Sequence, residues 1–254
     1  MTHKQKFIGI FSSPVKTFNT ISQQPVKHSF WLIPLIVMII VTIVSNILMK
    51  SYPGIQSTVR TSSITALEEQ LDQAVEKGIM STAQKKEQLY AIETRLIHED
   101  ASRFIPQSIV LFISSTLNFF IVSSIFLFGT KYFLRGKGAY VQAFIAYAVP
   151  LYILVLQTLV VIVLSIITSR YLAGTSIAAF VNVNTSTIGG SILNKSDPFL
   201  IWFYCIVGIG FAKMFNGGGV MKYIGMVFLV WIGSGVLVFF LAKVVPSIRW
   251  IINI

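Results

Sequence analysis

Residues 30–49 read FWLIPLIVMIIVTIVSNILM, a run of twenty residues without a charged side chain. A helix of about 20 apolar residues is long enough to cross the hydrocarbon core of a bilayer. The composition of the whole chain agrees, because 54% of its residues are hydrophobic and only 11% are charged. Soluble domains carry about 25% charged residues. The chain is therefore predicted to be an integral membrane protein.

Further apolar stretches give five predicted spans, at residues 30–49, 109–133, 145–169, 198–215 and 223–243. The predicted fold class is an all-α integral membrane protein, a bundle of five transmembrane helices. Pro150 stands inside the apolar stretch 139–169, where a proline kinks or breaks a helix. Two arrangements stay open there. One is a kinked hinge, and the other is an interfacial piece over 139–149 followed by a span over 150–169.

Lysine and arginine are distributed unequally between the two sides of these spans. The segments on the side of the N-terminus hold nine basic residues and no acidic one, whereas the other side holds eleven basic and nine acidic residues. Cytoplasmic loops carry the excess of Lys and Arg in membrane proteins. The N-terminus is therefore predicted to be cytoplasmic and the C-terminus outside. We expect the membrane to be a bacterial plasma membrane.

The basic segment 1–29 has a helical pattern of its own. Apolar residues recur at helical spacing between residues 7 and 21, and Pro14 suits the first position of a helix that Ser13 would cap. We expect an interfacial helix on the cytoplasmic leaflet, attached to anionic headgroups by lysines, namely Lys4, Lys6 and Lys16. The alternative is an unstructured basic leader.

The loop over residues 62–101 is predicted to form a helical hairpin outside the membrane. Thr65–Glu68 and Ser81–Gln84 each fit a capping box, which marks the start of a helix, and Gly78 fits a helix end. Apolar residues share one face of each helix, so we expect the two helices to pack on each other or on the spans.

The sequence lacks the motifs of common catalytic and metal sites. It contains no His-Glu-x-x-His motif, no phosphate-binding loop and no Gly-x-Ser-x-Gly elbow, and its three histidines are scattered. We therefore expect no enzymatic activity, no metal and no cofactor. Asn118 and Gln157 are polar residues within predicted spans. Such residues usually form hydrogen bonds between helices, and the alternative is that they line a path for a solute.

Asp197 is the only acidic residue after Asp100, and it stands in Ser196-Asp197-Pro198 just before a predicted span. An aspartate followed by proline is typical of a helix start, where the carboxylate caps the first amides and faces the positive end of the helix dipole. We expect structural capping, worth roughly 1 kcal/mol, by a carboxylate that is hydrated at headgroup level. Asparagine should then replace Asp197 well, because Asn also caps helices.

Four short motifs follow one another along the chain: FSSPVKTFNTISQQP (11–25), GKGAYVQAFIAYAVP (136–150), Asp197-Pro198-Phe199 leading into IWFYCIVGIGFAKMF, and Asn216-Gly-Gly-Gly. With five spans, they resemble the bacterial branch of the Yip family, the Rab-interacting polytopic membrane proteins. The resemblance implies a five-span membrane domain over 30–254 that is not an enzyme. Eukaryotic members act in membrane traffic and bind Rab-type GTPases. Their Asp-Leu-Tyr-Gly-Pro motif is missing here, so this role is not carried over.

These observations favour a scaffold or adaptor for membrane proteins or lipids, with a role in membrane organisation or traffic. The expected partners are anionic headgroups on the cytoplasmic face and another membrane protein bound through spans three to five. Nucleic acid is not expected despite the net charge of +11, because no soluble basic domain is present. The alternative is a small carrier or lipid-handling protein, in which Pro150, Asn118 and Gln157 serve a path.

Overall fold

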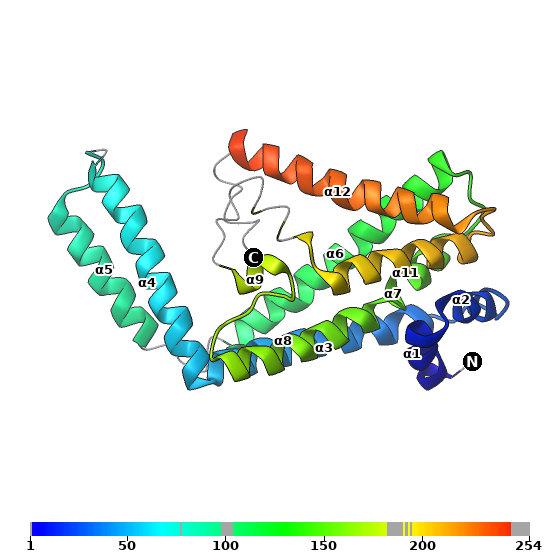
Figure 1. The fold of residues 1–254 in the computed structure, drawn as a ribbon, viewed down its shortest axis with the longest axis horizontal. Helices are drawn as coiled ribbons and strands as arrows, with labels where there is room; N and C mark the ends of the chain where they lie inside the picture. The colour runs from blue at the N-terminus through cyan, green and yellow to red at the C-terminus, as the bar shows by residue number, and fades with distance from the viewer. Residues whose placement is uncertain are drawn as a thin grey trace.

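The computed structural model describes residues 2–76, 78–97, 104–181, 190, 193 and 195–244. Within these ranges every regular element is a helix, which confirms the predicted all-α class. Figure 1 shows an elongated bundle with a pair of helices projecting from one end.

Three apolar helices are long enough to cross a membrane: Ser29–Ser51 (α3), Ile105–Phe133 within α6 (Phe104–Phe133), and Tyr140–Thr168, which comprises α7 (Tyr140–Ala148) and α8 (Leu151–Thr168). Two shorter apolar helices follow: Pro198–Met214 (α11) and Val220–Val236 within α12 (Val220–Val244). The chain is therefore a helical membrane protein. Each predicted span overlaps one of these apolar helices.

Helix α11 lies at the centre of the bundle, in contact with α2, α7, α8 and α12. Its glycines permit this close packing. A Cβ on Gly208 would lie 2.6 Å from the Cα of Ile224 on α12, and one on Gly210 would lie 2.8 Å from the carbonyl oxygen of Ala146 on α7. The surrounding core consists of aromatic rings from α6, α7 and α11 that contact one another: Phe126, Tyr147, Phe203 and Phe211.

Pro150 interrupts the third apolar stretch, as predicted. It lies between α7 and α8, and both Val149 and Pro150 keep helical dihedral angles. Because proline has no N–H, the carbonyl of Ala146 lacks its usual helical donor. Gly210 of α11 packs against that carbonyl. α7 is buried against α3, α6 and α11, and together with α8 it forms one apolar stretch long enough to cross a membrane, which favours the kinked span over an interfacial piece at 139–149.

The N-terminal segment forms two short helices, α1 (His3–Ser12) and α2 (Pro14–Ser22), instead of the single interfacial helix that the spacing predicts. Pro14 occupies the first position of α2, as predicted, but the Ser13 side chain makes no capping bond. Phe18 and Ile21 are buried, and α2 packs against α11. The segment is therefore part of the bundle.

Lys6 on α1 is buried as well. Its Nζ atom lies 3.0 Å from the centroid of the Phe30 ring on α3. The face of an aromatic ring attracts a cation. Burial, and secondarily the charge of Lys27, lowers the pKa of Lys6 from 10.5 to about 8. Lys6 therefore links α1 to α3, and the expectation that it contacts headgroups is wrong.

The predicted hairpin consists of α4 (Pro53–Glu76) and α5 (Thr82–Ile97), which pack on each other and share an ion pair between Asp72 and Lys85. Ser81 and Gln84 exchange both hydrogen bonds of the predicted capping box. Gly78 between the helices has a φ of +68°, which suits glycine. In Figure 1 the hairpin projects from the end of the bundle opposite to α1 and α2.

The predicted start of this hairpin, at residue 62 with a cap at Thr65, is wrong. α4 begins at Pro53, almost directly after α3, and Thr65 lies inside it with its hydroxyl donating to the carbonyl of Thr61. Pro53 suits a helix start and holds the preceding Tyr52 in an extended conformation. The predicted end at residue 101 lies outside the described residues.

Candidate functional site

Asp197 occupies the N-cap position of α11. Its Oδ1 atom accepts hydrogen bonds from the amides of Phe199, at 2.9 Å, and Leu200, at 3.3 Å. Pro198 at the first helical position has no N–H that would need a partner. This is the cap that the sequence predicts, and it satisfies amides that have no acceptor within the helix.

The same carboxylate also accepts hydrogen bonds from two distant parts of the chain. Gln157 of α8 donates through Nε2 to Oδ2 at 2.7 Å. Thr175 donates its amide to Oδ2 at 3.0 Å and its hydroxyl to Oδ1 at 2.8 Å. Asp197 thus accepts five hydrogen bonds, which join α8, α11 and the segment between them.

Thr175 reaches this position because the chain turns back after α8. Ser169 adopts a left-handed conformation with a φ of 50°, and the amide of Leu172 then donates to the hydroxyl of Ser165 at 3.2 Å. We call residues 169–176 the return segment. From Gln157 to the end of α8 the helix rises about 16 Å at about 1.5 Å per residue. This is about half the hydrocarbon thickness of a bilayer.

Asp197 is consequently buried deep in the bundle, with 2% of its surface exposed. The expectation that it is hydrated at headgroup level is wrong, because the return segment covers it. A buried charge needs hydrogen bonds or an opposite charge. In the part of the chain that the structure describes, the only ion pair is the one in the hairpin. The donors and the dipole of α11 therefore stabilise this carboxylate.

A polar cleft of about 200 Å³ opens beside Gln157, between α3, α8 and the return segment. Its walls carry hydrogen-bonding side chains, namely Thr42, Ser45, Asn46, Gln157, Thr158 and Tyr171. Ser45 is only 7% exposed, and its hydroxyl has no hydrogen-bond partner among the described residues. We call this feature the polar cleft. Its walls offer donors and acceptors to a small polar molecule.

The chemistry of the cleft is that of hydrogen bonding. Both oxygens of Asp197 are already occupied by donors. Within the described ranges, no group of three or more His, Cys, Asp or Glu side chains could hold a metal ion.

The structure brings Asp197 and Gln157 together, although the sequence singles them out on separate grounds. Pro198 and Phe199 belong to the same helix start, and Phe199 also packs against the core. Pro150 is buried at the junction of α7 and α8.

Asn118 is exposed on α6 and does not line the cleft, so no path shared by Asn118 and Gln157 is formed. Thr175 and Ser45 are site residues that sequence reasoning missed. They belong to no motif, and nothing in the sequence places either of them beside Asp197. Only the fold-back of the return segment and the packing of α3 on α8 place them at the site.

Comparison with known proteins does not assign this chain to a family. No family model matches the chain, and neither a curated protein nor a solved structure matches it. The resemblance to the Yip family therefore rests on the four short motifs and stays a prediction.

Proposed function

We propose that the protein is a non-enzymatic scaffold or adaptor, which binds membrane proteins or lipids and serves membrane organisation or traffic. In this proposal five spans cross a bacterial plasma membrane: α3, α6, the unit of α7 and α8, α11, and α12. The N-terminus is cytoplasmic and the C-terminus outside, following the distribution of Lys and Arg. α11 has 17 residues and rises about 26 Å, and the return segment lies above its start.

The hairpin of α4 and α5 is the observation that carries this proposal. It projects from the bundle (Figure 1), and Leu71 is buried within it. Large apolar side chains nevertheless remain exposed on it, since Ile79 at the turn is 75% exposed and Tyr90 on α5 is 73% exposed. We propose that these exposed apolar groups on the projecting hairpin form part of a surface that binds another protein.

The outer face of α6 supports a partner within the membrane. Ser114 and Asn118, one helical turn apart, are both exposed there, beside Leu117 and Ile121, which are 57% exposed each. A polar side chain facing hydrocarbon is unfavourable, and Asn readily forms hydrogen bonds across helices in membranes. We therefore assign the membrane contact to α6. The sequence pointed instead to spans three to five, of which α7 and α11 are largely buried in the bundle.

Site-specific crosslinking in living cells tests the adaptor proposal. A photoreactive amino acid in place of Ile79 should capture a defined protein, because this side chain is exposed at the hairpin turn. The control carries the same group in place of Met221, which is 79% exposed at the start of α12, at the other end of the bundle (Figure 1). A stoichiometric product from position 79 alone supports the proposal. Products with lipid only, or no product, contradict the binding of a protein through the hairpin.

The polar cleft favours a second function, that of a small carrier or lipid-handling protein. The cleft extends inward to Gln157, about the middle of the apolar stretch formed by α7 and α8. Binding sites of carriers commonly lie near the bilayer midplane beside the start of a short helix. Toward the N-terminal helices, however, the packed aromatic core fills the bundle, so transport would require this core to open.

Ligand-dependent stabilisation tests the carrier function without assuming the solute. The purified protein is screened by thermal unfolding against amino acids, sugars, polyols and nucleosides. Asn46→Leu alters a wall of the cleft without changing a partner of Asp197. Asn118→Leu is the matched control, because it makes the same change outside the cleft. A solute that stabilises the wild type and Asn118→Leu but not Asn46→Leu supports a carrier. The absence of any such solute counts against one.

A further inference from the structure

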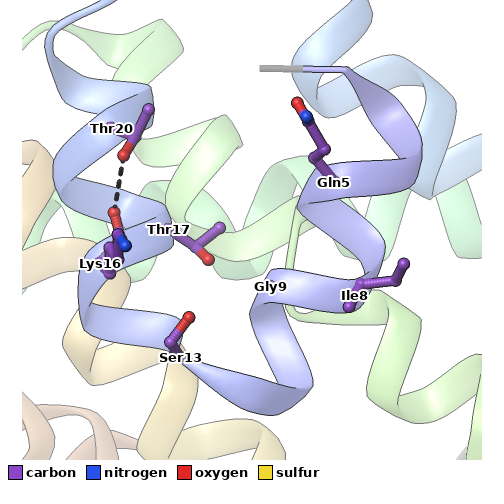
Figure 2. Close-up of a pocket in the computed structure, with 7 residues that line it drawn as sticks. All are labelled: Gln5, Ile8, Gly9, Ser13, Lys16, Thr17 and Thr20. Atoms are coloured by element: carbon purple, nitrogen blue, oxygen red, sulfur yellow. Dashed lines mark hydrogen bonds between the residues drawn. The ribbon is translucent and has the colours of Figure 1, made fainter.

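Helices α1 and α2 enclose a groove of about 500 Å³ (Figure 2). One wall is a single face of α2 and the residue before it, formed by Ser13, Lys16, Thr17 and Thr20. The facing wall on α1 is formed by Gln5, Ile8 and Gly9. The first acidic residue of the chain is Glu68, in the hairpin at the other end of the bundle. The segments that build the groove therefore supply positive charge and no carboxylate.

Three side chains of the groove can donate hydrogen bonds to an anion. Thr17 is 2% exposed, and its hydroxyl has no hydrogen-bond partner among the described residues. Figure 2 shows that its side chain is directed into the space between the two helices. The hydroxyl of Ser13 makes no capping bond to α2. Gln5 accepts a hydrogen bond from the amide of Thr2 through Oε1 at 2.9 Å, which leaves its own N–H groups as donors.

The first turn of α2 adds positive potential to this wall. Lys16 carries an exposed ammonium group. The amides of Val15 and Lys16 lie in the first turn, where a helix provides no acceptor, and neither has a backbone partner within the described residues. The positive end of a helix dipole and free amides together favour a bound anion, phosphate above all.

We propose that this groove binds the phosphate group of an anionic lipid headgroup. A lipid is the source because apolar side chains stand exposed on the same two helices: Ile8, which lines the groove, is 52% exposed, and Val15 at the start of α2 is 42% exposed. These side chains would contact acyl chains. In addition, α2 leads within seven residues into the apolar helix α3. The inference rests on the lipid-binding part of the proposed function, and it does not involve the hairpin.

Native mass spectrometry of the full-length protein in detergent, titrated with phosphatidylglycerol, tests the groove. Lys16→Gln removes the cation and Thr17→Val removes the buried hydroxyl, and each should weaken lipid binding about fivefold. Two matched controls should change it by less than about twofold. Lys4→Gln removes an exposed charge outside the groove. Thr168→Val at the end of α8 removes a hydroxyl outside the groove that already donates to the carbonyl of Leu164 at 2.8 Å.

Competition with inorganic phosphate distinguishes the two sources of the same chemical group. If phosphatidylglycerol stays bound to the protein in millimolar inorganic phosphate, the assignment to lipid is supported. If inorganic phosphate displaces phosphatidylglycerol, the groove is still a phosphate site, but its assignment to lipid is overturned. The groove itself is excluded if Lys4→Gln weakens binding as much as Lys16→Gln does, or if Lys16→Gln and Thr17→Val bind like the wild type. Crosslinking through position 79 reports on the adaptor function separately, so the two proposals can fail independently.

Discussion

A carboxylate buried in a membrane protein is stable only when donors surround it, and Asp197 has five. Two of them belong to the helix that it caps, and the other three come from Gln157 and Thr175. Because both oxygens are occupied, Asp197 joins three parts of the chain and leaves no oxygen free for a ligand. The polar cleft beside it would instead bind through Ser45, Asn46 and their neighbours.

We expect Asp197→Asn to lower the free energy of unfolding by about 1–3 kcal/mol. An amide has one acceptor oxygen, so its NH₂ group must face donors. In one orientation this NH₂ group would face the Gln157 Nε2 and Thr175 amide donors. In the other orientation it would face the amides that start α11. This replaces the expectation from the sequence that Asn, as another capping residue, substitutes well. Denaturant unfolding of the purified protein measures the difference.

The control for this prediction is Asp72→Asn, which makes the same change at an exposed carboxylate of the hairpin. Loss of an exposed ion pair should cost less than about 1 kcal/mol. If Asp197→Asn unfolded at the same denaturant concentration as the wild type, capping of α11 would be the whole role of Asp197, and the bonds to Gln157 and Thr175 would add nothing.

Lys6 should make stability depend on pH with a definite sign. Burial lowers its pKa in the folded protein from 10.5 to about 8, so the unfolded chain binds this proton more tightly. The unfavourable charge is fully present below about pH 8 and is relieved as the pH rises toward 10.5, so stability increases across that window. Thermal unfolding of Lys6→Met should lack this increase. Lys4→Met, at an exposed position, should retain it. An unchanged slope in Lys6→Met would contradict a buried amine.

At the scale of elements, the contact between α11 and α12 depends on one glycine. A Cβ on Gly208 would lie 2.6 Å from the Cα and 2.9 Å from the nitrogen of Ile224, and backbone atoms cannot move aside as a side chain can. We expect Gly208→Ala to lower stability by about 1–3 kcal/mol. Gly225→Ala is the matched control, because nothing lies within 4 Å of its Cβ and alanine favours a helix. Equal stabilities in unfolding measurements would mean that α11 and α12 are not in close contact.

The helices that hydropathy identifies could be predicted from the sequence, because a long apolar run has few alternatives to a membrane helix. The start of α4 was missed because Thr65 fits a cap equally well in isolation, while Pro53 sets the actual boundary. The return segment could not be predicted at all. It has no periodicity, and its course depends on a left-handed turn at Ser169 and on the distant Asp197. The cap of α11 was predictable because capping involves only neighbouring residues.

At the scale of the whole molecule, the two ends of the bundle differ in charge. The N-terminal helices contain only basic charged residues, whereas eight of the nine acidic residues lie between Glu68 and Asp100. Figure 1 places α1 and α2 at one end of the bundle and the hairpin at the other. An excess of Lys and Arg marks the cytoplasmic side. The proposed lipid groove would then face the inner leaflet, and the hairpin would reach a partner outside the cell.

Labelling of single cysteines tests this arrangement directly. The only native cysteine, Cys205, is first replaced by alanine. In intact spheroplasts, a membrane-impermeant maleimide should then label Ile79→Cys, because that side chain is 75% exposed on the hairpin outside the membrane. Met221→Cys, 79% exposed at the opposite end, should react only after permeabilisation. The matched exposure means that a difference in labelling reports the side of the membrane and not the reactivity of the site.

The reverse labelling pattern would place the N-terminus outside and move the lipid groove to the outer leaflet. Labelling of both cysteines in intact spheroplasts would contradict a bundle that spans the bilayer between them.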